Sequence, residues 1–300
     1  MRLWKLARYV GRPLLSLFVF DLAVAVAYVF IGWKWIAQPE IPVSIFGGVI
    51  GVLASFRNSS AYARWWEART IWGAIVNGSR NFAREVLSTI TATEGGEETE
   101  RDICKTKRKL VLLQIAYVHA LRSQLRGLPV WPELTGLISE QEMESLRTQK
   151  NVALAIQQNM ASLLGDCYRR GWIDNIRWAS LDRTLTSLMD NQGASERIKN
   201  TPMPRQYDMF IRFFIGIYCL VLPLGMVESL RLLTPIGSTF IGFIFLALDQ
   251  MGRNLEDPFE NRPHDIALTA ITRTIDINLR QMMGENEIPE PVVPVDGILW

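Results

Sequence analysis

Few side chains in this sequence could support catalytic or metal chemistry, and they lie far apart. There are two histidines, His119 and His264, and three cysteines, Cys104, Cys167 and Cys219. The cysteines form no CxxC pair and predict no disulfide framework, which is typical of a reducing compartment. The sequence contains no GxGxxG, GxxxxGK[ST] or HExxH motif. We therefore predict no catalytic residues, no metal site and no cofactor, and we expect His119 to pack between helices.

The overall charge excludes one class of partner. The 300 residues include 32 Lys+Arg and 30 Asp+Glu, so the formal net charge is only +2. Such a chain has no global field to attract a polyanion, and we predict no nucleic-acid partner. The hydrophobic fraction of 49% and the ten tryptophans exclude a disordered chain.

The charges are unevenly distributed and leave four apolar runs. Runs of this length can cross the roughly 30 Å hydrocarbon layer as helices. Asp21 and Arg212 are the charges within or beside them, and we expect these two to reach a membrane surface or to pair with each other. The runs predict two transmembrane hairpins, about 13–33 with 41–56 and about 210–226 with 230–248.

The remaining segments are predicted to be helical and polar. The second apolar helix should continue well beyond residue 56, because its apolar residues keep helical spacing, and Gly95, Gly96 and nearby glutamates should end it. Ser139 with Glu142 predicts a capping box. Further helices are expected at about 103–126, 152–170, 173–189 and 263–283. The predicted organisation is an N-terminal arm and hairpin (1–56), a helical domain (57–208), a second hairpin (209–249), and a helix with an extended tail (250–300).

Positive residues predict the orientation of this all-α membrane protein. Basic residues concentrate in the N-terminal arm, after the second run and around the second hairpin's outer ends. By the positive-inside rule, both termini and the large middle domain are predicted to be cytoplasmic.

The second apolar run has a pattern that could form a pore. Gly48, Val52 and Phe56 lie on one helical stripe at i, i+4 and i+8. Several copies around an axis would turn this stripe into a narrow hydrophobic constriction, which can gate by dewetting. Gly47 and Gly51 form a GxxxG tetrad, for which close helix packing is the simpler interpretation.

The residues that follow carry a family resemblance. The run FRNSSAYARWWEAR from Phe56 to Arg69, with Trp72 and Gly73, resembles the signature of the bestrophin family in its bacterial branch. TPMP at 201–204 and LEDPF at 255–259 extend the resemblance to about residues 5–285. It implies a homopentameric ion channel in the lipid bilayer of the bacterial inner membrane, with one central pore.

The resemblance also implies particular pore residues. The family's neck falls on Gly48, Val52 and Phe56, and because bulky side chains are usual there, Gly48 predicts a wide outer ring. The family's cytoplasmic aperture falls on Ile176, which from its spacing alone would be taken for a core residue. The positions of the calcium clasp found in animal members are here Asn254, Asp257, Arg262 and Asp265. Because an arginine opposes a cation, we predict no calcium site.

The expected function is passive conduction of monovalent ions, with chloride slightly favoured over sodium or other cations. Apolar rings do not by themselves select the sign of the ion. The alternative is a membrane-anchored scaffold or signalling protein without conductance. The tail, Pro289–Trp300, could dock on the cytoplasmic end of the pore as a regulatory element.

Overall fold

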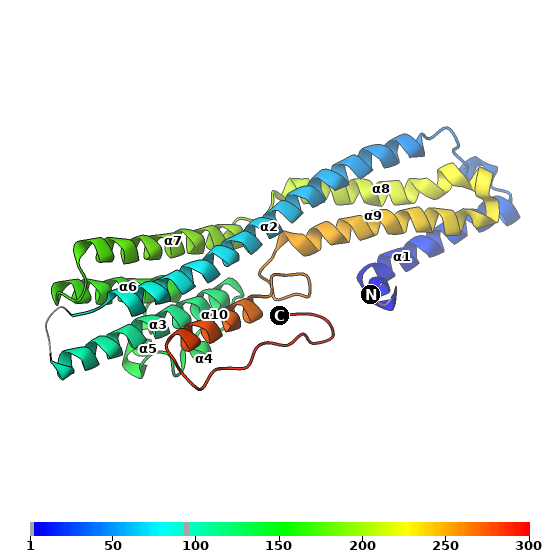
Figure 1. The fold of residues 1–300 in the computed structure, drawn as a ribbon. Coiled ribbons are helices and arrows are strands. Elements are labelled where there is room, and N and C mark those ends of the chain that lie inside the picture. The colour runs from blue at the N-terminus through cyan, green and yellow to red at the C-terminus, as the bar shows by residue number, and fades with distance from the viewer. Residues whose placement is uncertain (1–2, 93–95) are drawn as a thin grey trace. The chain divides into compact units, whose positions relative to one another are not determined.

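The computed structural model describes residues 3–92 and 96–300 of the chain. No β-strand occurs within these ranges, so the predicted all-helical fold class is confirmed for them (Figure 1). The α-helices are α1 (Leu3–Val26), α2 (Val43–Thr89), α3 (Glu97–Leu125), α4 (Trp131–Leu134), α5 (Glu140–Arg147), α6 (Val152–Arg169), α7 (Asn175–Asn200), α8 (Arg205–Leu230), α9 (Thr234–Glu256) and α10 (Leu268–Met282).

The helices group into two compact units. The first consists of Met1–Trp65 and Pro202–Asp257, and the second of Trp66–Thr201 and Pro258–Trp300. Helix α2 begins in the first unit and ends in the second, so it belongs to both. This continuation of the helix past residue 56 confirms the prediction made from its apolar spacing.

In the first unit, α1, α8 and α9 pack directly against one another (Figure 1). Two stretches here, Gly11–Ile31 and Asp208–Glu256, are long and apolar enough to cross a membrane. A π-helical turn (Ala27–Ile31) extends α1, and a 3₁₀ turn (Arg231–Leu233) joins α8 to α9. The connection is therefore later in the chain than predicted between the runs 210–226 and 230–248, because α8 remains helical to Leu230 and α9 begins at Thr234.

Helix α2 buries a stripe of residues in each unit. Within a unit most of these residues recur at spacings of three and four, which keeps them on one side of the helix. In the first unit they are Ile50, Ala54, Arg57 and Ala61. In the second unit they are Ala68, Trp72, Ile75, Ser79, Phe82 and Val86, with Ile71 and Ala83 buried beside them.

The second unit is a helical bundle in which α3 packs against α6, α7 and α10 (Figure 1). The residues of α3 from Leu110 to Leu121 are all buried, so this helix forms the centre of the core. The predicted capping box of α5 is confirmed, since the Ser139 side chain accepts from the Glu142 backbone and the Glu142 carboxylate accepts from Ser139.

Some predicted helix limits were wrong. Glu97, Glu98 and Glu100 lie in the first turn of α3 instead of ending α2, which stops at Thr89. Carboxylates are favourable there because a helix N-terminus carries partial positive charge. Glu94 and Gly95, also expected to end α2, lie outside the described residues.

The C-terminal elements also differ from prediction. Helix α7 continues to Asn200, well past the expected end at 189. Helix α10 begins at Leu268, later than expected, because the preceding chain forms a turn in which the Ile266 amide donates to the Pro258 carbonyl. The tail lies along α10 of its own chain: the Ala270 amide donates to the Trp300 backbone oxygen at 2.7 Å.

Candidate functional site

The predicted neck residues lie on the face of α2 that the chain leaves bare. The side chains of Val52 and Phe56 are 56% and 61% exposed, and nothing lies within 4 Å of a Cβ built at Gly48. Around Gly48 and Val52 the surface is slightly hollowed, and all five residues that line the hollow are apolar: Ile45, Gly48, Val49, Val52 and Leu53. The chain thus has an apolar helical face without a partner of its own.

The opposite side of the same helix explains this arrangement. Ile50 and Ala54 are buried in one cluster with Ile215 and Leu222 of α8. Because consecutive residues of an α-helix are turned by about 100°, burying 50 and 54 directs 48, 52 and 56 outward. The sequence-predicted stripe and the packed stripe therefore occupy different faces of α2.

The two glycines of the GxxxG tetrad differ in their surroundings. A Cβ added at Gly47 would lie 2.6 Å from the Tyr218 hydroxyl oxygen of α8, which is closer than atoms can approach. A Cβ at Gly51 would meet nothing within 4 Å. The interpretation of the tetrad as a close-packing motif therefore holds for Gly47 in this chain, and Gly51 has open space beside it.

Arg57, next to Phe56, is a residue whose role the sequence did not indicate. Its side chain is almost completely buried, and Nη1 donates to Asp249 Oδ1 of α9 at 2.7 Å. Nη2 pairs with Asp208 of α8. In the sequence, Arg57 is one of the positive residues that predict orientation and part of the run that resembles the family signature, and neither observation indicates its partners. Its partners are distant in sequence, so no local motif could have revealed the cluster.

The predicted cytoplasmic aperture residue, Ile176, is the second residue of α7 and is 77% exposed. Its position follows from the helix cap: the Asp174 carboxylate accepts from the Arg177 amide at 2.8 Å and starts the helix. The alternative that Ile176 is a core residue is wrong for the isolated chain. An exposed isoleucine at a helix end is available to line a path or contact another subunit.

Of the two alternatives expected for Asp21 and Arg212, reaching a membrane surface or pairing with each other, the pairing is wrong. Asp21 is fully buried, and its Oδ2 atom accepts from the Thr239 hydroxyl of α9 at 2.9 Å. Arg212 instead pairs with Asp208 one turn earlier on α8, at 3.0 Å. Each side chain thus has a partner other than the expected one: a hydroxyl of α9 for Asp21 and a carboxylate of the same helix for Arg212.

The second unit contains a polar cluster around His119, a residue predicted to pack between helices. Its two ring nitrogens face different carboxylates, Glu133 at 3.3 Å and Asp276 at 3.6 Å. Because the two acids lie on opposite ring nitrogens, they do not converge on one point. Among the described residues, no group of three or more His, Cys, Asp or Glu is arranged to hold a metal ion.

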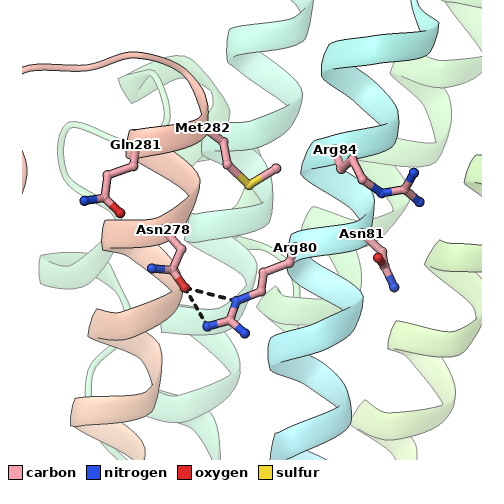
Figure 2. Close-up of a pocket in the computed structure, with 6 residues that line it drawn as sticks. All are labelled: Arg80, Asn81, Arg84, Asn278, Gln281 and Met282. Carbon is pink, nitrogen blue, oxygen red and sulfur yellow. Dashed lines mark hydrogen bonds between the residues drawn. The ribbon is translucent and has the colours of Figure 1, made fainter.

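A surface groove between α2 and α10 in the second unit is lined by Arg80, Asn81, Arg84, Asn278, Gln281 and Met282 (Figure 2). Arg80 reaches across it, and its Nε and Nη2 atoms donate to Asn278 Oδ1 at 3.0 and 2.7 Å. Figure 2 shows Arg84 directed away from α10. The groove therefore contains an arginine already paired with an amide, and no nucleophile with an adjacent base.

The acids expected at the calcium-clasp positions lie in the segment after α9. Asp257 directly follows Glu256, the last residue of α9. Asp265 Oδ2 accepts from the Arg262 amide at 3.0 Å, and burial raises the pKa of the Asp265 carboxyl above its ordinary value. The absence of a calcium site stays a prediction.

Comparisons with known proteins agree with the family resemblance and with the geometry of the chain. A family model described as bacterial/fungal bestrophin protein matches residues 6–281. The chain is 32% identical over 292 residues to the voltage-dependent anion channel-forming protein YneE of Escherichia coli K12, covering 96% of this chain and 91% of that protein. It is 34% identical over 249 residues to the voltage-dependent anion channel-forming protein alr2987 of Nostoc sp., covering 81% and 79%.

A solved structure is similar over nearly the whole chain. It is a bacterial bestrophin homologue from Klebsiella pneumoniae, with a TM-score of 0.84 and 27% sequence identity. The match covers 91% of this chain and 98% of that one. The fold therefore agrees with the family match made on sequence.

Proposed function

The chain belongs to the bacterial and fungal bestrophin family, and on this premise we propose that it is a membrane channel for monovalent ions and not an enzyme. The observation that carries the proposal is the bare apolar face of α2, where Val52 and Phe56 are more than half exposed while Ile50 and Ala54 on another face of the same helix are buried. An exposed apolar face of this length marks a contact with lipid or with another protein chain. In the proposed channel, this face lies on the ion path between several copies of the chain.

The proposed membrane topology has four spans. The two apolar stretches already described contain α1, α8 and α9, and the first part of α2 (Val43–Phe56) supplies the remaining span. The distribution of basic residues supports cytoplasmic termini and a cytoplasmic middle domain in the bacterial inner membrane. The exposed tryptophans Trp33 and Trp35, in the turn between α1 and α2, suit the opposite membrane interface.

The proposed assembly is a homopentamer in which α2 lines the axis. Five copies of Phe56 and Val52 would form the narrow apolar neck, and five copies of Gly48 a wider outer ring. Water is poorly stable in such a constriction, so small changes in its width control ion passage. Ile176, exposed at the start of α7, is proposed to form the cytoplasmic aperture.

The proposed ion is an anion, with chloride slightly favoured over sodium. Support comes from the relatives, since YneE of E. coli and alr2987 of Nostoc are named as anion channel-forming proteins. The apolar neck residues themselves do not distinguish the two signs of charge.

The test is the reversal potential of the purified protein in a planar bilayer under a NaCl gradient. A value near the chloride equilibrium potential supports the proposed anion channel. A value near the sodium equilibrium potential would retain a channel but overturn the proposed ion. Silence from well-formed pentamers would overturn the channel and favour a membrane-anchored scaffold.

A further inference from the structure

The packed stripe of α2 in the first unit contains one charged residue. Ile50, Ala54 and Ala61 are small or apolar, and Arg57 occupies the position between them with 1% of its surface exposed. The residue before it is Phe56, which is proposed to line the neck. Adjacent residues on one helix turn together, so whatever fixes Arg57 also fixes Phe56.

The Arg57 guanidinium is held on two sides. Nη1 donates to the Asp249 carboxylate at 2.7 Å and to the Asp249 carbonyl at 3.2 Å, both on α9. Nη2 pairs with the Asp208 carboxylate of α8 and lies 3.9 Å from Glu256 of α9. A planar guanidinium with several fixed partners is restrained in direction as well as position.

The carboxylates have further cations of their own. Asp249, whose side chain is 3% exposed, is also 2.8 Å from Arg253. Asp208 is also 3.0 Å from Arg212. Arg57, Arg212 and Arg253 therefore form a cluster with Asp208, Asp249 and Glu256 at the ends of the apolar stretches of α8 and α9, and Arg64 donates to the Glu256 carbonyl at 2.7 Å.

The backbone of α9 approaches α2 closely at the same level. The Asn58 side-chain amide donates to the Leu248 carbonyl at 3.0 Å. A Cβ added at Gly252 would overlap Asn58 Oδ1 and lie 3.4 Å from Arg57 Nη1. The absence of a side chain at Gly252 thus leaves room for the Arg57 and Asn58 contacts.

A buried charge in an apolar seam allows only one register. Moving α2 by one turn, about 5.4 Å, would place an apolar residue against Asp249 and leave the arginine without its carboxylates. A lone polar residue in an apolar helical seam is a known way of specifying register, at some cost in stability.

We propose that Arg57 is a positioning residue of the pore: its pairs with Asp208 and Asp249 fix the rotation and axial position of α2, and so hold Val52 and Phe56 toward the ion path. The inference rests on the proposed channel function. Arg57 itself does not face the path, because it lies on the buried stripe of α2.

The main test variant is Arg57→Met/Asp249→Asn, which removes a cation and an acid together. It leaves Asp208 paired with Arg212, and Arg253 is partly exposed and can be solvated. This variant avoids an unpaired buried charge, so it should still fold and assemble; light scattering of the purified protein checks this. The matched control is Arg101→Met/Glu97→Gln, which removes an exposed ion pair of α3.

Rotation of α2 is measured by comparing the modification rates of two introduced cysteines, Val52→Cys and Ile50→Cys. The two positions lie on different faces of the helix. The background carries Cys104→Ser, because Cys104 is exposed while Cys167 and Cys219 are buried. A water-soluble methanethiosulfonate reagent modifies each cysteine in proteoliposomes, and single-channel conductance is recorded alongside. Loosening of the whole fold would speed both reactions, whereas rotation changes their ratio.

With Arg57 present, we expect the cysteine at 52 to react at least tenfold faster than the cysteine at 50. In the double variant this ratio should fall at least threefold, and conductance should change at least twofold, while the Arg101 control changes neither. An unchanged ratio and conductance in assembled pentamers of the double variant would overturn the role of Arg57. Silent wild-type pentamers would instead overturn the channel function on which it rests.

Discussion

The Nε2 atom of His119 on α3 lies 3.6 Å from Asp276 Oδ2 on α10, and the other ring nitrogen faces Glu133. Burial alone would lower the pKa of His119, but the two carboxylates that face its ring outweigh burial and raise the pKa above the ordinary value. The His119 contact in turn holds the pKa of Glu133 at about 2. Arg122, beside His119, and Arg280, beside Asp276, are the neighbouring cations.

This relationship predicts a loss of stability at alkaline pH. A group whose pKa is raised by folding stabilises the folded state below its unfolded pKa, near 6.5, and this stabilisation disappears as pH rises through the raised folded pKa. Thermal unfolding of the detergent-solubilised protein should therefore occur at lower temperature as pH increases above neutrality. His119→Gln should flatten this dependence. An equal slope in that variant would assign the effect to other groups.

Gly47 and Gly48 are adjacent on α2 but have different surroundings, so alanine substitutions at the two positions can be compared directly. Gly48→Ala should raise stability by about 0.5–1 kcal/mol, because alanine is the better helix former and the added Cβ meets nothing within 4 Å. It should also lower conductance by narrowing the proposed outer ring. Gly47→Ala should lower stability, because its Cβ would lie 2.6 Å from the Tyr218 hydroxyl. Melting temperatures of the two variants check the pair, and equal shifts would contradict the packing.

Removing the proposed barrier should increase flux. Val52→Ala/Phe56→Ala replaces two exposed apolar side chains, so the individual chain loses little packing, while the neck becomes wider and easier to hydrate. Single-channel conductance or ion flux from proteoliposomes should rise several-fold. No change in a properly assembled double variant would remove these residues from the neck.

Ile173 and Ile176 allow a test that distinguishes a path-lining residue from a packing residue. Ile176 is 77% exposed, whereas Ile173 is 3% exposed. Ile173→Ala should cost about 2–5 kcal/mol of stability through the cavity it leaves. Ile176→Ala should change stability by less than about 0.5 kcal/mol, yet it should alter conductance if Ile176 forms the aperture. Denaturation and bilayer recordings on both variants measure this. A large stability loss from Ile176→Ala would indicate a buried subunit contact instead.

Much of the fold was predictable because it depends on local patterns. The apolar periodicity predicted the continuation of α2, and the spacing of Ser139 and Glu142 predicted the cap of α5. The exposed stripe through Val52 and Phe56 was also visible, since helical spacing is a property of adjacent turns. Helix ends were less predictable: the first turn of α3 and the last turns of α7 depend on caps and packing as well as on composition.

The ionic contacts were not predictable from spacing. Arg57 meets Asp208 and Asp249 from 151 and 192 positions away, and an arginine directly after an apolar run is also what the positive-inside pattern produces. The same limit explains the wrong pairing of Asp21 with Arg212. Several arrangements of four apolar helices satisfy the same hydropathy, and side-chain packing between helices selects which charges meet.

The buried stripe of α2 in the second unit also limits how the length of this chain can vary. Inserting or deleting one residue between Trp72 and Phe82 would turn all later residues of the helix by about 100° about its axis. Phe82 and Val86 would then leave the second unit's core, or Ala68 and Trp72 would leave it. We expect related sequences to gain and lose residues in the loops, while within this part of α2 only changes of about seven residues, close to two full turns, would keep the stripe on one face of the helix.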